Sequence, residues 1–359
     1  MTSRASSELL LVGSLPGSST DSVLRVASEL FGDIVFALPD GETGPRAGWV
    51  AYERATLFKS HPDLEITPQT ESPTDIPRHA YETPLLRIRD GVTELRWDRW
   101  PRIDDAMVSY ELFSRLKREG VIASHLRFQV SLPFPASVLY GFRPNYAVDY
   151  PVAARGFEDL VRRELKRLLS AIPDDELAIQ WDVCFEVLDL EGVLAWTSGD
   201  AWERFTGSVR RLAPLVPEDV LLGYHLCYGT FPEWPMYEAR DMGLLVRMAN
   251  YAVSESGREV DWIHMAGPRY LRSEDNSFFQ PLSELKGCDA RVYLGIVLPL
   301  DGVPGLKRRH RMASKYLTDF GVSMYCGFGR QPGIDGMQTM REHSRVVRSL
   351  RGAPMKGAD

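Results

Sequence analysis

Eight short apolar runs, separated by stretches with helical periodicity, constrain the fold of this chain more than any other feature. The runs are mostly continuous rather than alternating, which is typical of parallel strands covered on both faces. Several of them end in glycine or proline, as strands often do before a loop. They lie at Leu9–Val12, Ile34–Leu38, Leu126–Leu132, Leu177–Val183, Val220–Leu226, Trp262–Met265, Arg291–Leu298 and Val322–Tyr325.

Apolar residues recur at helical spacing between these runs. The expected helices are Thr20–Phe31, Val152–Ile172, Asp200–Leu215, Ala239–Ser254, Gly305–Phe320 and Met337–Leu350. Eight strands that alternate with helices in one chain predict a closed (β/α)8 barrel, a TIM barrel of the α/β class. We assign residues 1–351 to this single barrel domain and residues 352–359 to a flexible tail.

The interval 44–122 is too long for a minimal connection between the second and third strands of such a barrel. Within it, residues 86–95 resemble a hairpin that turns at Asp90-Gly91. We interpret the interval as an insertion between strands two and three that helps to cover the mouth of the barrel.

The composition indicates a globular protein and disfavours several classes of function. The 359 residues carry a net charge of −7 that is spread along the chain, so we expect no nucleic-acid partner. No apolar run approaches the roughly 20 residues that span a bilayer, and the N-terminus does not resemble a secretory signal. Four cysteines in so long a chain do not resemble a disulfide framework and fit a reducing, cytoplasmic compartment. The composition leaves the oligomeric state open.

A histidine and a cysteine two residues apart, in His225-Leu-Cys227, stand at the end of the fifth apolar run. In an extended chain both side chains leave the same face, so both can reach one metal ion. His264 and Cys326 stand at the same relative place in later runs. Thiolate and imidazole suit Zn²⁺ better than Mg²⁺ or Ca²⁺. These four residues therefore predict a zinc site.

Other polar residues also stand at the ends of the predicted strands, where the active site of a (β/α)8 barrel lies. The clearest of them are Ser14, Asp40, Glu42 and Asp182. Together with the metal candidates, they predict one site at this rim of the barrel.

Short motifs at the strand ends resemble the catalytic barrel of the cobalamin-independent methionine synthases and of epoxyalkane:coenzyme M transferase. These enzymes belong to the superfamily that also contains uroporphyrinogen decarboxylase. The resemblance extends over most of the barrel, as motifs rather than as continuous identity. The motifs are Val12-Gly-Ser-Leu-Pro16, Asp40-Gly-Glu-Thr-Gly44, Gln180-Trp-Asp182, His225-Leu-Cys227 and Cys326-Gly327. The last two match zinc-ligand elements of the family and are the most specific.

The resemblance implies a zinc ion held by His, two Cys and a carboxylate that follows the fifth strand. His264 stands where the relatives place Glu, so we expect two histidines and two cysteines around the ion. The alternative is that His264 is a core histidine and that water or Glu274 takes the fourth position. The resemblance also implies that Asp182 and Glu42 hold the ammonium group of a substrate such as homocysteine. The family chemistry is thiol activation, because zinc lowers the pKa of a bound thiol and so produces a nucleophile at neutral pH.

Substrate-binding residues are expected around the mouth. Arg46 and Arg269 follow strand-end motifs and could bind a carboxylate or sulfonate bidentately. Tyr228 belongs to a set of loop aromatics that could line a pocket for an aromatic or bulky substrate, or could pack the loops against the barrel. Ser14, in the first motif, is assigned to substrate binding as well.

We therefore predict a zinc-dependent transferase that activates a thiol for transfer of a methyl or larger alkyl group between small molecules. The alternative is a metal-dependent lyase of the retro-aldol or decarboxylating type, in which the ion polarises a carbonyl. Dependence on a thiol separates the two, since only the transferase needs a sulfur acceptor. No stretch matches the folate-binding segments of the family, which disfavours methionine synthesis from a folate polyglutamate.

Overall fold

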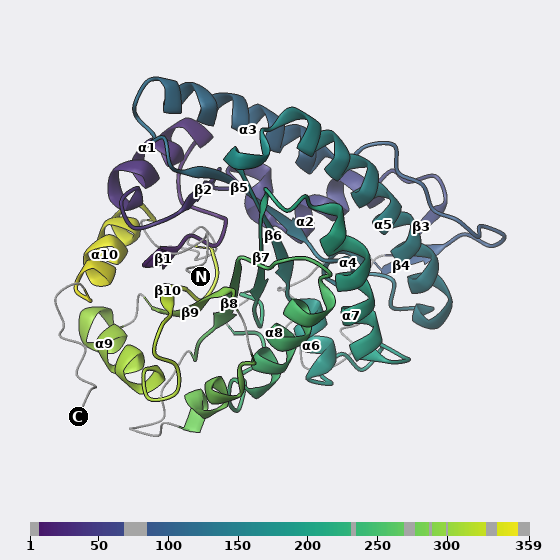
Figure 1. Cartoon of the computed structure of the whole chain (residues 1–359). Coiled ribbons are helices and arrows are strands. Elements are labelled where there is room, and N and C mark those ends of the chain that lie inside the picture. Colours follow the sequence, from purple (N-terminus) through teal and green to yellow (C-terminus); the bar gives the residue numbers. More distant parts are fainter. Residues whose placement is uncertain are drawn as a thin grey trace.

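A computed structural model describes residues 7–67, 85–230, 235–268, 277–286, 289–298, 301–327 and 336–350. Eight strands form one sheet in the order β1-β10-β9-β8-β7-β6-β5-β2, and each pair of neighbours is parallel (Figure 1). The strands are β1 Leu9–Leu10, β2 Ala37–Pro39, β5 Arg127–Pro133, β6 Leu177–Val183, β7 Leu221–Leu226, β8 Trp262–Ala266, β9 Arg291–Val297 and β10 Gly321–Met324.

The two end strands of this order meet and close the sheet into a barrel. Just beyond β1 and β2, Ser14 and Gly41 pair through a parallel bridge. The N–H of Leu15 also donates to the carbonyl oxygen of Gly41 at 2.9 Å. The predicted (β/α)8 barrel is therefore confirmed. All eight predicted strands are present, with ends that differ from the prediction by no more than three residues.

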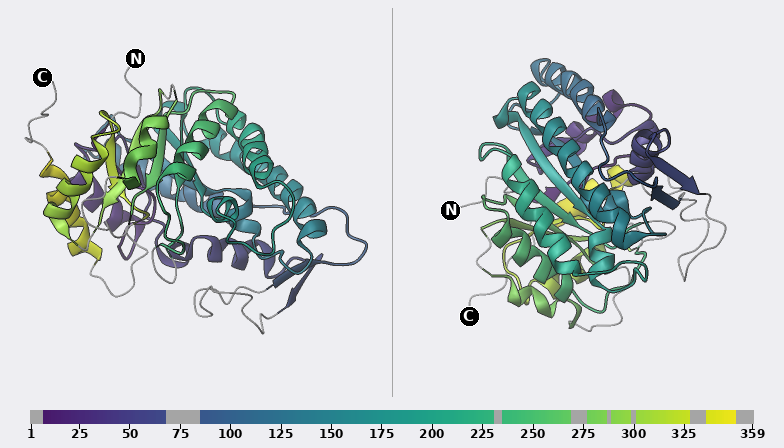
Figure 2. Two further views of the ribbon diagram at one scale, coloured as in Figure 1. Left: turned by 90° about the horizontal axis from the view of Figure 1, so that it is seen from below. Right: turned by 90° about the vertical axis from the view of Figure 1, so that its right-hand side faces the viewer.

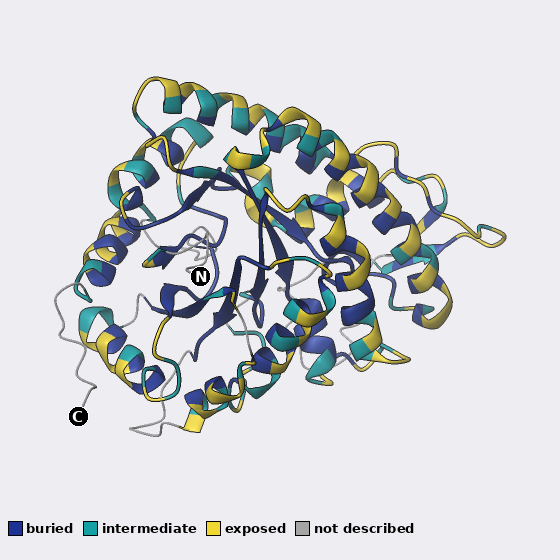
Figure 3. Ribbon diagram, viewed as in Figure 1, coloured by how far each residue is buried: buried dark blue, intermediate teal, exposed yellow. Residues whose placement is uncertain are grey.

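Helices surround the barrel and turn their buried faces toward it (Figures 2 and 3). The longer ones are α1 Thr20–Phe31, α3 Pro101–Arg118, α5 Tyr146–Ala171, α7 Ala201–Leu212, α8 Gly243–Glu255, α9 Gly302–Ala313 and α10 Gly336–Arg348. The shorter ones are η1 Gly44–Gly48, α2 Val50–Glu53, η2 Arg54–Phe58, α4 Pro135–Leu139, η4 Asp174–Glu176, α6 Phe185–Leu190, η5 Ala213–Leu215 and η6 Ser277–Glu284. Within the described ranges, none of these helices combines the length and the apolar character needed to cross a membrane.

The connection between β2 and β5 contains a small second sheet. Its two strands, β3 Leu64–Thr67 and β4 Leu85–Ile88, are antiparallel and lie at one side of the barrel (Figure 1). The predicted hairpin at Asp90-Gly91 is wrong. A turn does form there, with Gly91 at a φ of +84°, but β4 pairs with β3 rather than with the residues that follow the turn. The covering of the mouth by residues 44–122 stays a prediction.

The barrel interior is apolar at the end where the strands begin. A separate buried cluster lies there and consists of Leu10, Phe36, Ala37, Ala178, Leu221, Trp262 and Tyr293. The rings of Phe36 and Trp262 have centroids 5.0 Å apart. Gly223 makes room for the indole, because a Cβ at this position would lie 2.0 Å from the ring of Trp262. Asp182, His225 and Cys326 lie toward the opposite end, where the strands finish.

Candidate metal centre and active site

Three buried side chains at the carboxyl ends of the strands form a group that could hold a metal ion. His225 is the last residue but one of β7. Cys227 directly follows that strand, and Cys326 follows β10. One ligand atom from each residue lies within 4.8 Å of the other two. Two sulfurs and an imidazole are donors that zinc accepts readily, whereas Mg²⁺ and Ca²⁺ take oxygen ligands. The donor set therefore fits zinc.

The two thiols of this group are poor acids in the absence of a cation. Contact with the Cys184 thiol, together with burial, raises the pKa of Cys227 well above its ordinary value. Contact with Cys227 and burial do the same to the pKa of Cys326. A metal ion reverses this preference, because a coordinating thiol loses its proton. Metal binding here would release protons and weaken as the pH falls.

His264 lies beside the group, but its ring nitrogens have other partners. Its Nδ1 is 2.6 Å from Nδ1 of His225 on the neighbouring strand. Its Nε2 is 2.8 Å from the carbonyl oxygen of Met324, which can only accept, so Nε2 carries a proton. Burial lowers the pKa of His264 to about 4, so the ring is neutral at neutral pH. Nδ1 of His264 then accepts from His225, whose own Nε2 keeps the lone pair that a metal would need.

The structure thus does not bring the predicted ligand His264 into the group of possible metal ligands. The ring lies in the barrel interior, where Gly295 gives it space, since a Cβ there would be 3.0 Å from Nε2 of His264. Hydrogen bonds of this kind, from a ligand histidine to a fixed acceptor, orient the ligand in many metal sites.

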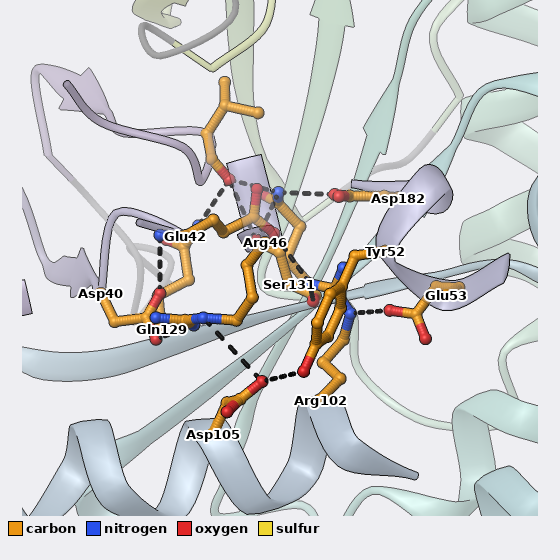
Figure 4. Close-up of polar contacts among 12 residues, drawn as sticks. Asp40, Glu42, Arg46, Tyr52, Glu53, Arg102, Asp105, Gln129, Ser131 and Asp182 are labelled. Atoms are coloured by element: carbon orange, nitrogen blue, oxygen red, sulfur yellow. Dashed lines mark hydrogen bonds and ion pairs between the residues drawn. The ribbon is translucent and has the colours of Figure 1, made fainter. Parts of the chain in front are cut away.

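A network of side-chain amides connects Asp182 to the barrel interior. The carbonyl oxygen of Val12 accepts hydrogen bonds from Nε2 of Gln129 at 2.9 Å and Nε2 of Gln180 at 2.6 Å. Gln180 also donates to Oδ1 of Asp182 at 2.9 Å. Asp182 is in register with His225 on the next strand, so it lies next to the metal group. Figure 4 shows the surroundings of Gln129 and Asp182.

Four buried polar atoms in this region have no hydrogen-bond partner among the described residues. They are Oγ of Ser14, Nη2 of Arg102, and Oε1 of both Gln129 and Gln180. Ser14 Oγ lies against Gly327, because a Cβ at that position would be 2.1 Å from it. Gly327 directly follows Cys326 in the chain. Buried polar atoms nearly always have partners. These four atoms therefore mark a place where a bound ligand could supply the hydrogen-bond partners that are lacking.

Glu42, which the sequence predicted to hold a substrate ammonium group together with Asp182, forms a buried ion pair with Arg102 of α3 (Figure 4). Nη1 of Arg102 is 2.8 Å from Oε1 of Glu42, and Nε contacts a carboxylate oxygen of Glu53. The other oxygen of Glu53 accepts from Nε1 of Trp100 at 2.5 Å. Burial by itself would lower the pKa of Arg102, but the charges of Glu53 and Glu42 outweigh it and raise this pKa. Glu42 thus faces a permanent cation of the chain itself.

Arg102 was missed in the sequence because it stands in a helix rather than at a strand end. One signal could have found it. Positions 102, 106, 109, 113 and 116 of α3 are all buried, and their spacing is that of one helix face. An arginine on a buried stripe is rare unless it has a partner.

A pocket lies beside these residues, between β2, β5 and α3. Its lining consists of Gly13, Pro39, Asp40, Glu42, Arg46, Arg102, Ala106, Phe128, Gln129, Val130 and Ser131. Arg46, a predicted substrate-binding residue, is paired here with Asp40, and its Nε is 4.0 Å from Oδ2 of Asp105. Asp105 also accepts from the Tyr52 hydroxyl at 2.6 Å. Carboxylates of the chain therefore surround Arg46 (Figure 4).

The remaining predicted substrate-binding residues are less informative. Ser14 was placed above, close to Cys326. Tyr228 is buried, and its hydroxyl donates to Glu191 at 3.3 Å. Arg269 lies outside the described residues. The roles given to these residues stay predictions.

Comparison with known proteins bears on the fold. No family model matches the sequence, and no curated protein matches it. A solved structure from Listeria monocytogenes, provisionally assigned as a vitamin-B12 independent methionine synthase, matches with a TM-score of 0.55 and 15% identity. The match covers 93% of this chain and 86% of that one. A B12-independent methionine synthase from Shewanella sp. W3-18-1, in complex with selenomethionine, matches with a TM-score of 0.57 and 13% identity, over 95% and 96% of the two chains.

This chain has the fold of the B12-independent methionine synthases. The resemblance predicted from the strand-end motifs is thereby confirmed for the fold. At these identities the comparison leaves the reaction to be inferred from the site.

A buried carboxyl group, Glu186 of α6, is expected to make the stability of the fold depend on pH. It accepts hydrogen bonds from the N–H groups of Ala136 at 2.8 Å and Ser137 at 3.2 Å, and from the Ser137 hydroxyl at 2.7 Å. Burial nevertheless raises the pKa of Glu186 to about 7. In an unfolded chain the pKa of a glutamate is about 4.3.

We expect the Glu186→Gln variant to lack this pH dependence. Because the folded state binds the proton more tightly, the stabilisation is complete below the unfolded pKa and is lost as the pH rises through about 7. Between pH 5 and 8, the free energy of unfolding of the wild type should fall by about 2–3 kcal/mol relative to Glu186→Gln. Denaturant unfolding of both proteins at several pH values measures this difference. A difference that stays constant would contradict the raised pKa.

Proposed function

We propose that this protein is a zinc-dependent transferase that activates a thiol for transfer of a methyl or larger alkyl group. The observation that carries the proposal is the buried group of His225, Cys227 and Cys326 at the strand ends of a barrel. Zinc held there would lower the pKa of a thiol substrate and so supply a thiolate at neutral pH. The naming of two proteins of this fold as B12-independent methionine synthases supports transfer to sulfur.

The residues around the group would bind and orient the substrate. Asp182 and the amide oxygens of Gln129 and Gln180 are hydrogen-bond acceptors, and acceptors of this kind suit an ammonium group. Ser14 offers a hydroxyl close to Cys326. Because these side chains are buried, they would also keep water away from the reacting sulfur.

The ion pair with Arg102 changes the role expected of Glu42. A cation of the chain already neutralises this carboxylate, so we propose that Asp182 makes the main contact with an ammonium group. Nη2 of Arg102, which has no partner among the described residues, could bind an anionic group of the same ligand. A small thiol that carries both charges fits this arrangement. The relative from Shewanella, solved with selenomethionine, supports a small-molecule substrate.

The proposal is tested by metal analysis and then by assays with candidate thiols. Protein purified without chelators should contain about one zinc per chain, because the three donors, with one further ligand, make a single four-coordinate site. It should consume a thiol in the presence of an alkyl donor, lose this activity when zinc is removed, and regain it when Zn²⁺ is restored. Turnover without any thiol would instead identify a metal-dependent lyase. Protein that binds no zinc would refute the proposal.

We expect Asp182→Asn to reduce kcat/KM at least about tenfold while the fold and the zinc content stay nearly unchanged. Asparagine keeps an oxygen for the hydrogen bond from Gln180 but removes the negative charge. Steady-state kinetics, circular dichroism and zinc analysis give the three readouts. Asp175→Asn, an exposed change before the start of the same strand, is the control and should behave as wild type. An unfolded Asp182→Asn would show that Asp182 has a structural role.

We propose that His264 orients His225 and is not itself a ligand. His264→Ala removes the acceptor for Nδ1–H of His225 and should weaken zinc binding about 10- to 100-fold, with the same kinds of atoms around the ion. Competition with a chromophoric chelator gives the affinity, and X-ray absorption gives the neighbours of zinc. If His264 is the ligand that the sequence predicted, the variant will lose one nitrogen neighbour. His264→Glu, with the residue of the relatives, would then restore the affinity.

A further inference from the structure

A third buried thiol, Cys184, lies where β6 ends and α6 begins. Val183 is in register with Leu226, so β6 and β7 are still adjacent at their last residues. The N–H of Cys227 donates to the carbonyl oxygen of Val183 at 3.1 Å, which continues the pairing by one more step. Cys184 and Cys227 are therefore the next neighbours across this strand pair.

The Cys184 thiol touches the group of His225, Cys227 and Cys326 through Cys227, although it is not among the atoms that all lie within 4.8 Å of one another. The Cys227 thiol is in contact with the thiols of both Cys184 and Cys326. His225 contacts Cys326. Gly229, with a φ of +74°, lies next to the Cys184 thiol: a Cβ there would be 2.4 Å from Sδ of Met236 and 3.3 Å from Sγ of Cys184. All three thiols are buried, with exposed fractions of 1%, 3% and 8% for Cys184, Cys227 and Cys326.

The backbone of Cys184 is fixed by hydrogen bonds that do not involve its thiol. Oγ of Ser137 accepts from the N–H groups of Cys184 and Phe185, both at 3.1 Å. The same hydroxyl donates to Glu186 at 2.7 Å. The backbone of Cys184 is thus held in place, while its thiol contacts Cys227 and makes none of these hydrogen bonds.

We propose that Cys184 is the fourth metal ligand, so that the site without substrate consists of one histidine and three cysteines. This inference rests on the proposed function, because it concerns the same ion. Three Cys and one His form a well-attested tetrahedral zinc set. With Zn–S bonds of about 2.3 Å, two sulfurs on one ion are about 3.8 Å apart, which is a separation of thiols in contact. The fourth ligand would then come from the end of β6, once the Cys184 side chain turns from its contact with Cys227 toward the ion, whereas His264 on β8 stays bound to His225 and Met324.

X-ray absorption at the zinc edge tests this inference, because it counts sulfur and nitrogen neighbours and needs no activity. Wild-type protein loaded with zinc should show about three sulfurs and one nitrogen. Cys184→Ser should show two sulfurs, and its affinity for zinc, measured against a chromophoric chelator, should be at least about tenfold lower. Cys227→Ser is the positive control, since it removes a sulfur from the group that the structure already places together.

The possible outcomes separate the two proposals. Two sulfurs in the wild type, with the same count and the same affinity in Cys184→Ser, would overturn the inference about Cys184 and leave a zinc-dependent transferase intact. Protein that takes up no zinc would overturn the proposed function and this inference with it. If Cys184→Ser does not fold, the sulfur count of the wild type decides the question without a variant.

Discussion

Serine in place of Cys227 or Cys326 is expected to remove most of the zinc and, with it, the transfer activity. The apparent free energy of zinc binding in such sites is roughly 10–16 kcal/mol, so each of four ligands contributes on the order of 3 kcal/mol. Loss of one ligand should therefore weaken binding on the order of 100- to 1,000-fold. A serine hydroxyl does not compensate, because it stays protonated at neutral pH and is a poor zinc ligand.

Zinc per chain after dialysis against a weak chelator measures this loss, and circular dichroism shows whether each variant is folded. His310→Ala is a suitable control, because His310 lies on the outer helix α9 and should not affect the zinc content. Full zinc occupancy in both serine variants would show that these residues do not bind the metal ion. The buried cysteines would then be ordinary core residues of the barrel.

Replacing Arg102 with alanine is expected to lower the free energy of unfolding by about 3–5 kcal/mol. Arg102 is the buried partner of both Glu42 and Glu53, which are themselves buried. Without the guanidinium, two carboxylates would be left close together in the interior, and each would lose the cation that offsets its desolvation. Denaturant unfolding at neutral pH measures the change.

Two further variants show whether charge pairing is the cause. Arg115→Ala, on the exposed side of the same helix, should change the free energy of unfolding by less than about 0.5 kcal/mol. Combining Arg102→Met with Glu42→Gln and Glu53→Gln removes all three charges together and should recover most of the lost stability. A loss below about 1 kcal/mol in Arg102→Ala would mean that the pairing is weak.

Most of the fold could be predicted because its two periodicities are strong in the sequence. The predicted strand Leu177–Val183 coincides with β6, and the predicted helix Thr20–Phe31 coincides with α1. The error at Asp90-Gly91 has a clear cause. A turn sequence indicates a reversal of the chain, but it does not select the strand that β4 will pair with. The strand that pairs with β4 is β3, which precedes it in the chain.

The candidate site could be predicted only as far as strand ends define it. Parallel strands bring their carboxyl ends to one rim, and this brings His225, Cys227 and Cys326 together. Side-chain partners depend in addition on register and on the depth of each residue in the barrel, which a sequence does not display. His264 was expected on the correct strand, yet its nitrogens bind neighbours other than a metal. Arg102 reaches the interior from a helix, where no strand-end rule applies.

The apolar cluster around Trp262 also limits how molecules reach the site. Among the described residues, it fills the end of the barrel where the strands begin. At the proposed site, a metal ion and a substrate would then both approach from the other end. A substrate bound over the ion would lie between it and solvent. We therefore expect bound substrate to slow the loss of zinc to a chelator.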